Sequence, residues 1–590
     1  MDAVSSPSPA SPPTLGVGSV VRVNGPLVEV DGVANLAMLE LVAVGPQRIS
    51  AQTVALSGEH AVLQAYEYTG GLKVGDPAEA TGGELAGLLG PGLLGHAFDG
   101  LLRPLSSAPM WLTPDRAASD ADTATLSREW TFEPASSVGP SVAAGDLLGT
   151  VPDSGAVEHR VLVPPGISGE LSWLAPKGPL RALDPVATVG GRTVTLAERW
   201  PVRQARPFRQ SLSEAVPLHT GQRVLDLIYP LARGAAAAVP GGFGTGKTML
   251  LQQIAKWSDA DVIVYVGCGE RGNEMADVLD GLAELVDERS GGRLIDRTVI
   301  IANTSNMPMM AREASIYTGI TVAEFYRDMG YEVVVIADST SRWAEALREF
   351  ANRNGDLPAE DGFPATLASA LGAFYERAGR VKTLSGHTAS VTVIGAVSPA
   401  GGDMTEPVTT DTQRFVRSLW LLDRDLAYSR HYPAVSWSGS FARDVDAIGR
   451  WYTANGQPEW TQRRSRTVAL LAEADRLDSL AEIMGRSSLP GHERMVLLGG
   501  RLIRDGVLLQ SALSANDGFC SDEKGAALLD LVLGVVDECQ ELVQRGVAAT
   551  TIEQADLGAV LRAREETGPS DAVGVSSRLP RVLTMLRALQ

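Results

Sequence analysis

The first part of the chain is a succession of short segments in which apolar and polar residues alternate between Gly, Asn and Pro. Segments such as Leu27 to Gly32 and Ala61 to Tyr68 follow this pattern. It is typical of strands in a small closed β-barrel, which we expect over residues 15–77. A second Gly/Pro-rich β segment, with a Pro-Pro-Gly turn at Pro164, predicts an insertion over residues 114–192.

Further along the chain the pattern changes from short strands to strands that alternate with helices. This alternation continues to residue 435 and predicts a parallel sheet flanked by helices, with residues 78–113 and 193–435 in one central α/β domain. Residues 436–590 have apolar positions three and four apart, as in Thr467 to Ala474, which predicts a C-terminal α-helical domain. Residues 1–14 are rich in Ser and Pro and lack the features of a signal peptide, so we expect a disordered tail.

Composition narrows the classes of partner that this multidomain chain can have. The 590 residues include 51 Lys and Arg against 70 Asp and Glu, a formal net charge of −19, which disfavours general binding to nucleic acid. No apolar stretch approaches the roughly 18 residues that cross a bilayer, so we expect contact with a membrane only through other proteins. The three cysteines form no C-x-x-C pair, which fits a reducing, cytoplasmic location.

The most specific motif is a glycine-rich loop that follows the apolar segment Gly234 to Pro240. The loop consists of Gly241, Gly242, Phe243, Gly244, Thr245, Gly246, Lys247 and Thr248, and satisfies G-x-x-x-x-G-K-T. Glycines let backbone N–H groups wrap phosphates, and a helix that opens at Lys247 adds its positive dipole end. The loop therefore predicts a triphosphate site in which Lys247 neutralises phosphate oxygens and Thr248 binds Mg²⁺.

Two further apolar segments end in charged residues that suit the same chemistry. Asp338 closes the segment Tyr331 to Asp338, and a carboxylate at the carboxyl end of a parallel strand faces the ligand crevice, where it suits the water shell of Mg²⁺. Glu270 and Arg271 follow the apolar segment that begins at Val262. Hydrolysis of a terminal phosphate needs a group that orients water and a cation that balances charge, and these two residues are candidates. An ordinary ion pair between them is the alternative.

Several longer motifs, in the right order along the chain, resemble the catalytic A subunit of V/A-type rotary ATPases. The motifs are 242–248, 256–261, 267–275, 337–349, 374–380, 395–399 and 401–408. The resemblance extends from about Gly16 to the C-terminus. It implies an N-terminal β-barrel, a bulge domain in the insertion, a RecA-like P-loop domain and a C-terminal helical bundle.

The resemblance also implies a function, coupling of ATP hydrolysis or synthesis to proton or sodium transport. Its implied ligands are ATP or ADP with Mg²⁺. Its implied partners are a B-type subunit in an alternating hexamer, central and peripheral stalk subunits and a membrane rotor, with the chain on the cytoplasmic face of the membrane. The roles it implies are phosphate and Mg²⁺ binding for Lys247 and Thr248, water polarisation for Glu270, contact with the terminal phosphate for Arg271 and Arg342, metal binding for Asp338 and stacking on adenine for Tyr432.

At three positions the chain departs from residues that such proteins carry. Leu513 stands where relatives usually have a second adenine-facing Phe, although without the resemblance it would be taken for a helix core residue. Ala370 replaces a usual Arg, for which we have no functional account. Thr245 occupies the loop position that is Cys in eukaryotic vacuolar relatives, so thiol gating at this loop is not expected.

Three other functions use the same fold or site. A homohexameric secretion-type export ATPase is disfavoured by the insertion and the long C-terminal domain. A non-catalytic regulatory nucleotide-binding protein would not need Glu270, the candidate water-orienting acid. A Rho-like RNA translocase is disfavoured by the net charge of −19.

Overall fold

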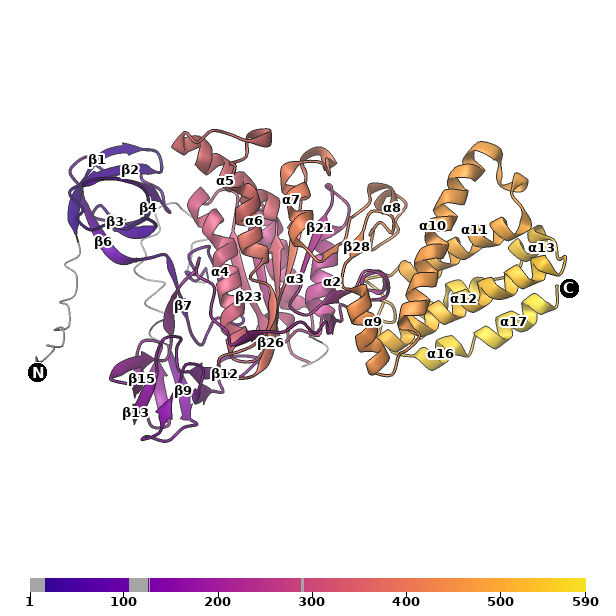
Figure 1. Cartoon of the computed structure of the whole chain (residues 1–590), viewed down its shortest axis with the longest axis horizontal. Helices are drawn as coiled ribbons and strands as arrows, with labels where there is room; N and C mark the ends of the chain where they lie inside the picture. The colour runs from indigo at the N-terminus through magenta and orange to yellow at the C-terminus, as the bar shows by residue number, and fades with distance from the viewer. Residues whose placement is uncertain (1–15, 106–125, 127, 288–290, 590) are drawn as a thin grey trace, which may run out of the picture.

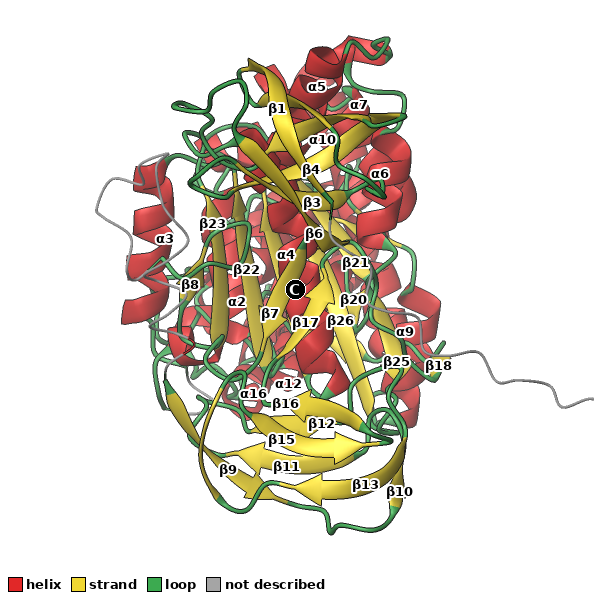
Figure 2. Cartoon of the chain, turned by 90° about the vertical axis from the view of Figure 1, so that its left-hand side faces the viewer, coloured by secondary structure: helices red, strands yellow, loops and turns green. Residues whose placement is uncertain are grey.

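The computed structural model describes residues 16–105, 126, 128–287 and 291–589. The predicted tail over residues 1–14 and the start of the predicted insertion therefore lie outside the described residues. Along the long axis of the molecule, the N-terminal β-barrel is followed by the central α/β domain and then by the helical domain (Figure 1). The insertion projects beside the central domain, at the opposite end from the barrel strands in Figure 2.

The N-terminal domain is a closed barrel with the strand order β1-β2-β5-β4-β3-β6. Its strands are Val17–Asn24 (β1), Leu27–Asp31 (β2), Glu40–Val44 (β3), Ile49–Ser57 (β4), His60–Ala65 (β5) and Pro77–Glu84 (β6). The alternating apolar residues point inward, so Val28, Val42 and Leu63 are fully buried. Strand β6 pairs with both β1 and β3 and closes the barrel, which therefore extends to Glu84, beyond the expected boundary at residue 77.

The insertion consists of two four-stranded antiparallel sheets, β10-β13-β15-β16 and β12-β11-β9-β14. Their strands are Glu129–Pro134 (β9), Ser141–Val142 (β10), Leu147–Val151 (β11), His159–Leu162 (β12), Gly169–Leu174 (β13), Gly178–Arg181 (β14), Pro185–Val189 (β15) and Arg192–Thr195 (β16). Phe132, Leu148 and Val186 are fully buried in their common core. Strand β16 takes the insertion past the expected end at residue 192. Strand Glu198–Pro201 (β17) then pairs with Ala86–Leu89 (β7).

The central domain contains a ten-stranded sheet with the order β28-β27-β21-β26-β24-β22-β23-β8, to which β25 and β18 add at the side of β26. The strands are Ala97–Phe98 (β8), Gln210–Ser211 (β18), Ala236–Pro240 (β21), Val262–Cys268 (β22), Thr298–Asn303 (β23), Glu332–Asp338 (β24), Gly379–Lys382 (β25), Thr388–Val397 (β26), Ser418–Leu419 (β27) and Phe441–Ala442 (β28). A separate pair joins Pro217–Leu218 (β19) and Leu231–Ala232 (β20). The strands from β21 to β8 are parallel, as predicted.

Helices cover both faces of this sheet, which explains why its central strands are continuous apolar runs. Every residue of β22 is buried. The helices and short turns of helix are Val224–Ile228 (η1), Lys247–Trp257 (α2), Gly272–Glu284 (α3), Leu294–Arg297 (η2), Met309–Asp328 (α4), Thr340–Asn354 (α5), Glu360–Gly362 (η3), Leu367–Tyr375 (α6), Ala400–Gly402 (η4), Pro407–Phe415 (α7) and Arg424–Tyr428 (α8). The carboxyl ends of parallel strands share one edge, so the segments after β21, β22 and β24 meet there.

The C-terminal domain is helical, as predicted. Its elements are Val445–Ala454 (α9), Trp460–Met484 (α10), Arg486–Ser488 (η5), Gly491–Ile503 (α11), Arg504–Leu508 (η6), Asp522–Gln544 (α12), Ala549–Glu553 (α13), Gly558–Leu561 (α14), Ala563–Glu566 (α15), Ala572–Ser576 (α16) and Leu579–Arg587 (α17). Because β28 still pairs with β27 of the central sheet, the boundary lies later than the expected residue 436. Among the described helices, none combines the length and apolar character needed to cross a bilayer.

Candidate nucleotide site

The phosphate loop connects β21 to α2, in the strand-loop-helix context that its motif requires. Gly244 and Gly246 have positive φ angles of 79° and 83°, which glycine adopts without a steric penalty. Thr245 is buried, and its hydroxyl donates a hydrogen bond to the Gly242 carbonyl at 2.8 Å. Phe243 and Thr248 are exposed. The loop thus presents its backbone and the N-terminus of α2 to the outside of the sheet edge.

Lys247 begins α2 and its side chain lies along the loop. The Nζ atom donates to the carbonyl oxygens of Gly241 at 3.1 Å and Val397 at 3.0 Å, and to the Ser398 hydroxyl. Burial lowers the pKa of Lys247, while the carboxylates of Asp338 and Glu270 act in the opposite direction. The ammonium group is therefore close enough to both carboxylates to interact with them.

Asp338 is the last residue of β24 and is buried at the sheet edge. The hydroxyl of Tyr265, on the neighbouring strand β22, donates to Asp338 Oδ2 at 3.1 Å. Burial raises the pKa of Asp338, while Lys247 and the Tyr265 hydrogen bond lower it. The expected position of Asp338, at a strand end beside the phosphate loop, is the one that the structure shows.

Glu270 follows β22 and is half-buried. Its pKa is raised to about 7, first by burial, then by a hydrogen bond from Glu274 and by the negative charge of Asp338. Gly269 precedes it with a φ of 75°, and a Cβ atom there would lie 2.7 Å from Arg342 Cβ. Only glycine therefore allows this strand end and Arg342 to approach so closely.

The two predicted arginines lie in different surroundings. Arg342, near the start of α5, donates from Nη1 to both carboxylate oxygens of Glu345, at 2.9 and 3.1 Å, and also interacts electrostatically with Glu270. Arg271 is exposed and directly precedes α3. The cation next to Glu270 is thus Arg342, a residue 72 positions later in the chain than the strand end it faces by the arithmetic 342 − 270.

Tyr432 lies beside the phosphate loop, and Leu513 lies in the segment next to Tyr432. A Cβ atom on Gly246 would be 3.0 Å from Tyr432 Cε1. The backbone N–H of Gln510 donates to the Tyr432 carbonyl at 2.8 Å. Leu513 is 93% exposed in a turn, so the interpretation of this residue as part of a helix core is wrong.

The structure adds residues that the sequence did not single out. Ser398, after β26, contacts Lys247 and donates its backbone N–H to the Ser341 hydroxyl at 2.8 Å. Glu274 contacts Glu270 from the first turn of α3. The spacing of four residues between the two glutamates was a usable signal, because a helix that starts between them brings such positions together.

Four family descriptions match successive parts of the chain. Residues 20–82 match the β-barrel domain of the ATP synthase alpha/beta family, 122–203 its barrel-sandwich domain, 221–442 its nucleotide-binding domain, and 449–552 the C-terminal domain of V and A type ATP synthase. The V-type ATP synthase alpha chain of Nitrosococcus oceani is 47% identical over 567 residues, which cover 94% of each chain. The catalytic chain of the A-type ATP synthase of Thermofilum pendens, its A subunit, is 45% identical over 564 residues, again 94% of each chain. The chain belongs to the family of A subunits, or alpha chains, of V/A-type ATP synthases.

Membership of this V/A-type family confirms the predicted fold class, domain order and enzyme class, a nucleotide-binding component of a rotary ATPase or ATP synthase. The secretion ATPase EscN of enteropathogenic E. coli has a similar structure, with a TM-score of 0.62 over 88% of this chain and all of that one, at 20% identity. At that identity the likeness concerns the fold alone. It leaves the V/A-type assignment unchanged.

Proposed function

We propose that this chain hydrolyses or synthesises ATP as the catalytic member of a ring in which it alternates with a B-type subunit. The observation that carries the proposal is the meeting of Lys247, Asp338 and Glu270 at one sheet edge, beside the phosphate loop. A binding-only site needs the lysine and the loop but gains nothing from a half-buried glutamate that titrates near neutral pH. The three residues come from separate segments that the parallel sheet aligns.

The donor set suits MgATP as substrate. The free N–H groups of the first turn of α2 and its dipole favour the phosphates, and Lys247 supplies a positive charge that no carboxylate holds in a hydrogen bond among the described contacts. Thr248 and Asp338 provide oxygen ligands of the type that Mg²⁺ prefers. Tyr432, half-exposed beside Gly246, offers a ring face on which the base can stack.

In this proposal each residue at the sheet edge has one task in phosphoryl transfer. Glu270 orients the attacking water and accepts a hydrogen bond from it, which requires its carboxylate form. Arg342, and Arg271 once the neighbouring protein of the ring closes the site, balance the charge that develops on the terminal phosphate. A further arginine from the B-type partner completes the site, and an arginine supplied in trans is worth about 10³–10⁵ in turnover.

The assembly follows from the same proposal. The chain would contact central and peripheral stalk subunits and, through them, a membrane rotor that moves protons or sodium ions. It would then lie on the cytoplasmic face of the membrane. No direct contact with lipid or nucleic acid is required.

The experiment that tests the proposal is reconstitution of MgATPase activity from purified chains. The chain alone is expected to bind MgATP and to turn over poorly, and to gain activity when a B-type partner is added. The matched control is the same mixture with Lys247→Ala in this chain, which should stay inactive. Full activity of a homohexamer without partner would overturn the proposal in favour of an export-type ATPase.

A further inference from the structure

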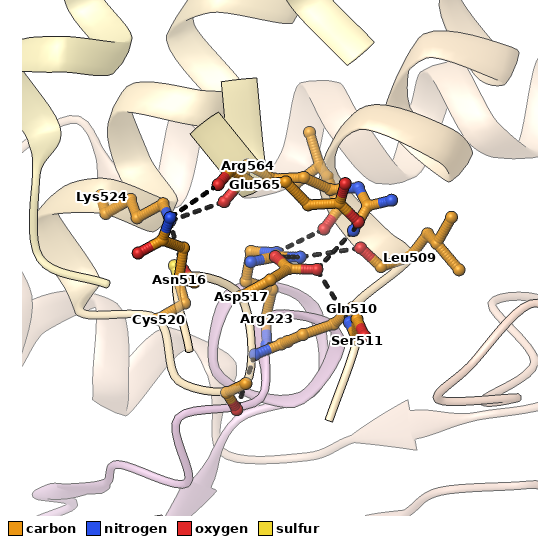
Figure 3. Close-up of polar contacts among 12 residues, drawn as sticks. Arg223, Leu509, Gln510, Ser511, Asn516, Asp517, Cys520, Lys524, Arg564 and Glu565 are labelled. Atoms are coloured by element: carbon orange, nitrogen blue, oxygen red, sulfur yellow. Dashed lines mark hydrogen bonds and ion pairs between the residues drawn. The ribbon is translucent and has the colours of Figure 1, made fainter. Parts of the chain in front are cut away.

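A buried cluster of charges joins the nucleotide-binding domain to the C-terminal helices (Figure 3). Its centre is Asp517, a fully buried residue in the loop between η6 and α12. Asp517 Oδ1 lies 2.7 Å from Arg223 Nη2, whose residue directly precedes η1 of the nucleotide-binding domain. Asp517 Oδ2 forms an ion pair with Nη1 of Arg564, on α15. One carboxylate thus meets cations from two distant segments.

The same cluster holds both ends of the loop. Asp517 Oδ2 accepts a hydrogen bond from the Ser511 backbone N–H at 2.8 Å. Arg223, 1% exposed, donates from Nε to the Val507 carbonyl at 2.5 Å and from Nη2 to the Leu509 carbonyl at 2.7 Å. The backbone of residues 507–517 is therefore fixed by side chains that lie outside the loop or at its end.

The loop in turn contacts the predicted base site. Gln510 donates its backbone N–H to the Tyr432 carbonyl, and its side-chain amide is held by the Arg223 N–H and the Gly221 carbonyl, both at 2.8 Å. Tyr432 packs against Gly246 of the phosphate loop. Leu513, three residues after Gln510, is the exposed apolar residue at the tip. An unbroken series of contacts thus connects Arg564, in the helical domain, with the phosphate loop.

We propose that Asp517, together with Arg223 and Arg564, positions the loop 509–517 for the nucleotide base and makes base affinity depend on the C-terminal helices. This inference rests on the proposed function, because it assigns the base to the Tyr432 side of the loop. Two charges that replace a hydrophobic contact bring little net stability when buried, whereas their fixed geometry can specify one loop position. The three residues are positioning residues, since none of them touches the substrate.

The test compares a ligand with a base and one without, on the full chain. We expect Arg564→Ala to weaken binding of MgATP about fivefold or more, while binding of magnesium tripolyphosphate, which has no base, stays unchanged. Arg564→Lys keeps a cation near Asp517 and should lie between the alanine variant and the wild type. Arg562→Ala is the matched control, because Arg562 is an exposed arginine that pairs with Glu566 on the surface, and neither ligand should respond to it.

The outcomes separate this inference from a general loss of structure. An equal loss of affinity for both ligands, or unchanged affinity for both, would overturn it. If Arg564→Ala does not fold, the same comparison with Arg564→Lys decides, and a loss confined to MgATP is again required. A wild-type chain that binds neither ligand would contradict the proposed function itself rather than the role of Asp517.

Discussion

Glu270 and Glu274 share a hydrogen bond between the end of β22 and the first turn of α3. Two carboxyl groups can form such a bond only when one of them carries a proton. Together with burial, the first cause, this contact raises the pKa of Glu270 to about 7. The candidate water-orienting residue therefore changes charge near neutral pH, where a general base is most effective.

Glu270→Gln should remove most of the turnover and leave nucleotide binding in place. The amide keeps the size of the side chain but cannot take up a proton, so we expect steady-state MgATPase activity of the reconstituted complex to fall about 10²–10⁴-fold. Glu349→Gln, which alters an exposed carboxylate on α5 that pairs with Arg353, is the control. Turnover within a factor of about two of the wild type would exclude the water-orienting role.

The activity should also fall as the pH drops through about 7, because Glu270 is then protonated. Glu274 contributes to the raised pKa through its hydrogen bond and its charge, so Glu274→Gln should lower that pKa and move the acid limb of kcat/KM to lower pH. A pH profile of kcat/KM checks this. Asp277→Asn, an exposed change on the same helix, should leave the limb in place. An acid limb that Glu274→Gln does not move would show that another group controls it.

Gly269→Ala should separate turnover from binding. The new Cβ atom would lie 2.7 Å from Arg342 Cβ, at a residue whose φ is 75°, so the strand end, Glu270 and Arg342 must shift. A left-handed conformation costs an alanine about 1–2 kcal/mol, which thermal unfolding should register. We expect a large loss of MgATPase activity with little change in MgATP affinity, since Lys247 is not displaced.

The control for that variant lies three residues further along. A Cβ atom on Gly272, at the start of α3, meets nothing within 4 Å. Gly272→Ala should therefore keep activity and stability near the wild type. Equal behaviour of the two alanine variants would refute the steric argument.

Leu513→Phe should strengthen nucleotide binding. An aromatic pair with the base is worth about 0.5–1.5 kcal/mol, so MgATP affinity should rise about two- to tenfold, while tripolyphosphate affinity stays constant. Leu513 is 93% exposed, so the larger ring meets no packed neighbour. Leu357→Phe, at another highly exposed leucine, is the control and should change neither affinity. No gain for Leu513→Phe would mean that this position does not face the base.

The sequence predicted those features that depend on neighbouring residues. The glycine pattern at 241–248 and the apolar run before it identified the loop, and the run that ends in Asp338 identified a strand end. The exposure of Arg271 could not be predicted, because it depends on where α3 begins and how its first turn is oriented. The contact of Arg342 with the backbone at Gly269 joins α5 to β22, and nothing in the spacing of either segment specifies it.

Domain boundaries were less predictable than the domains. Strand β6 lies beyond the expected barrel boundary at residue 77, because its Ala, Thr and Gly residues lack a strong apolar alternation, although its pairing with β1 and β3 is what closes the barrel. The membership of β8 in the central sheet depends on a partner strand about 200 residues away, a separation that local periodicity does not report.

Strand β8 has a practical consequence for dissection of the protein. It pairs in parallel with β23, and the Gly100 carbonyl after it accepts a hydrogen bond from Thr318 on α4 at 2.7 Å. A fragment that starts at residue 193 would lack this strand and leave the outer side of β23 without its cover. Bare strand edges recruit other chains, so such a fragment is expected to self-associate, whereas one that retains residues 86–105 should remain dispersed.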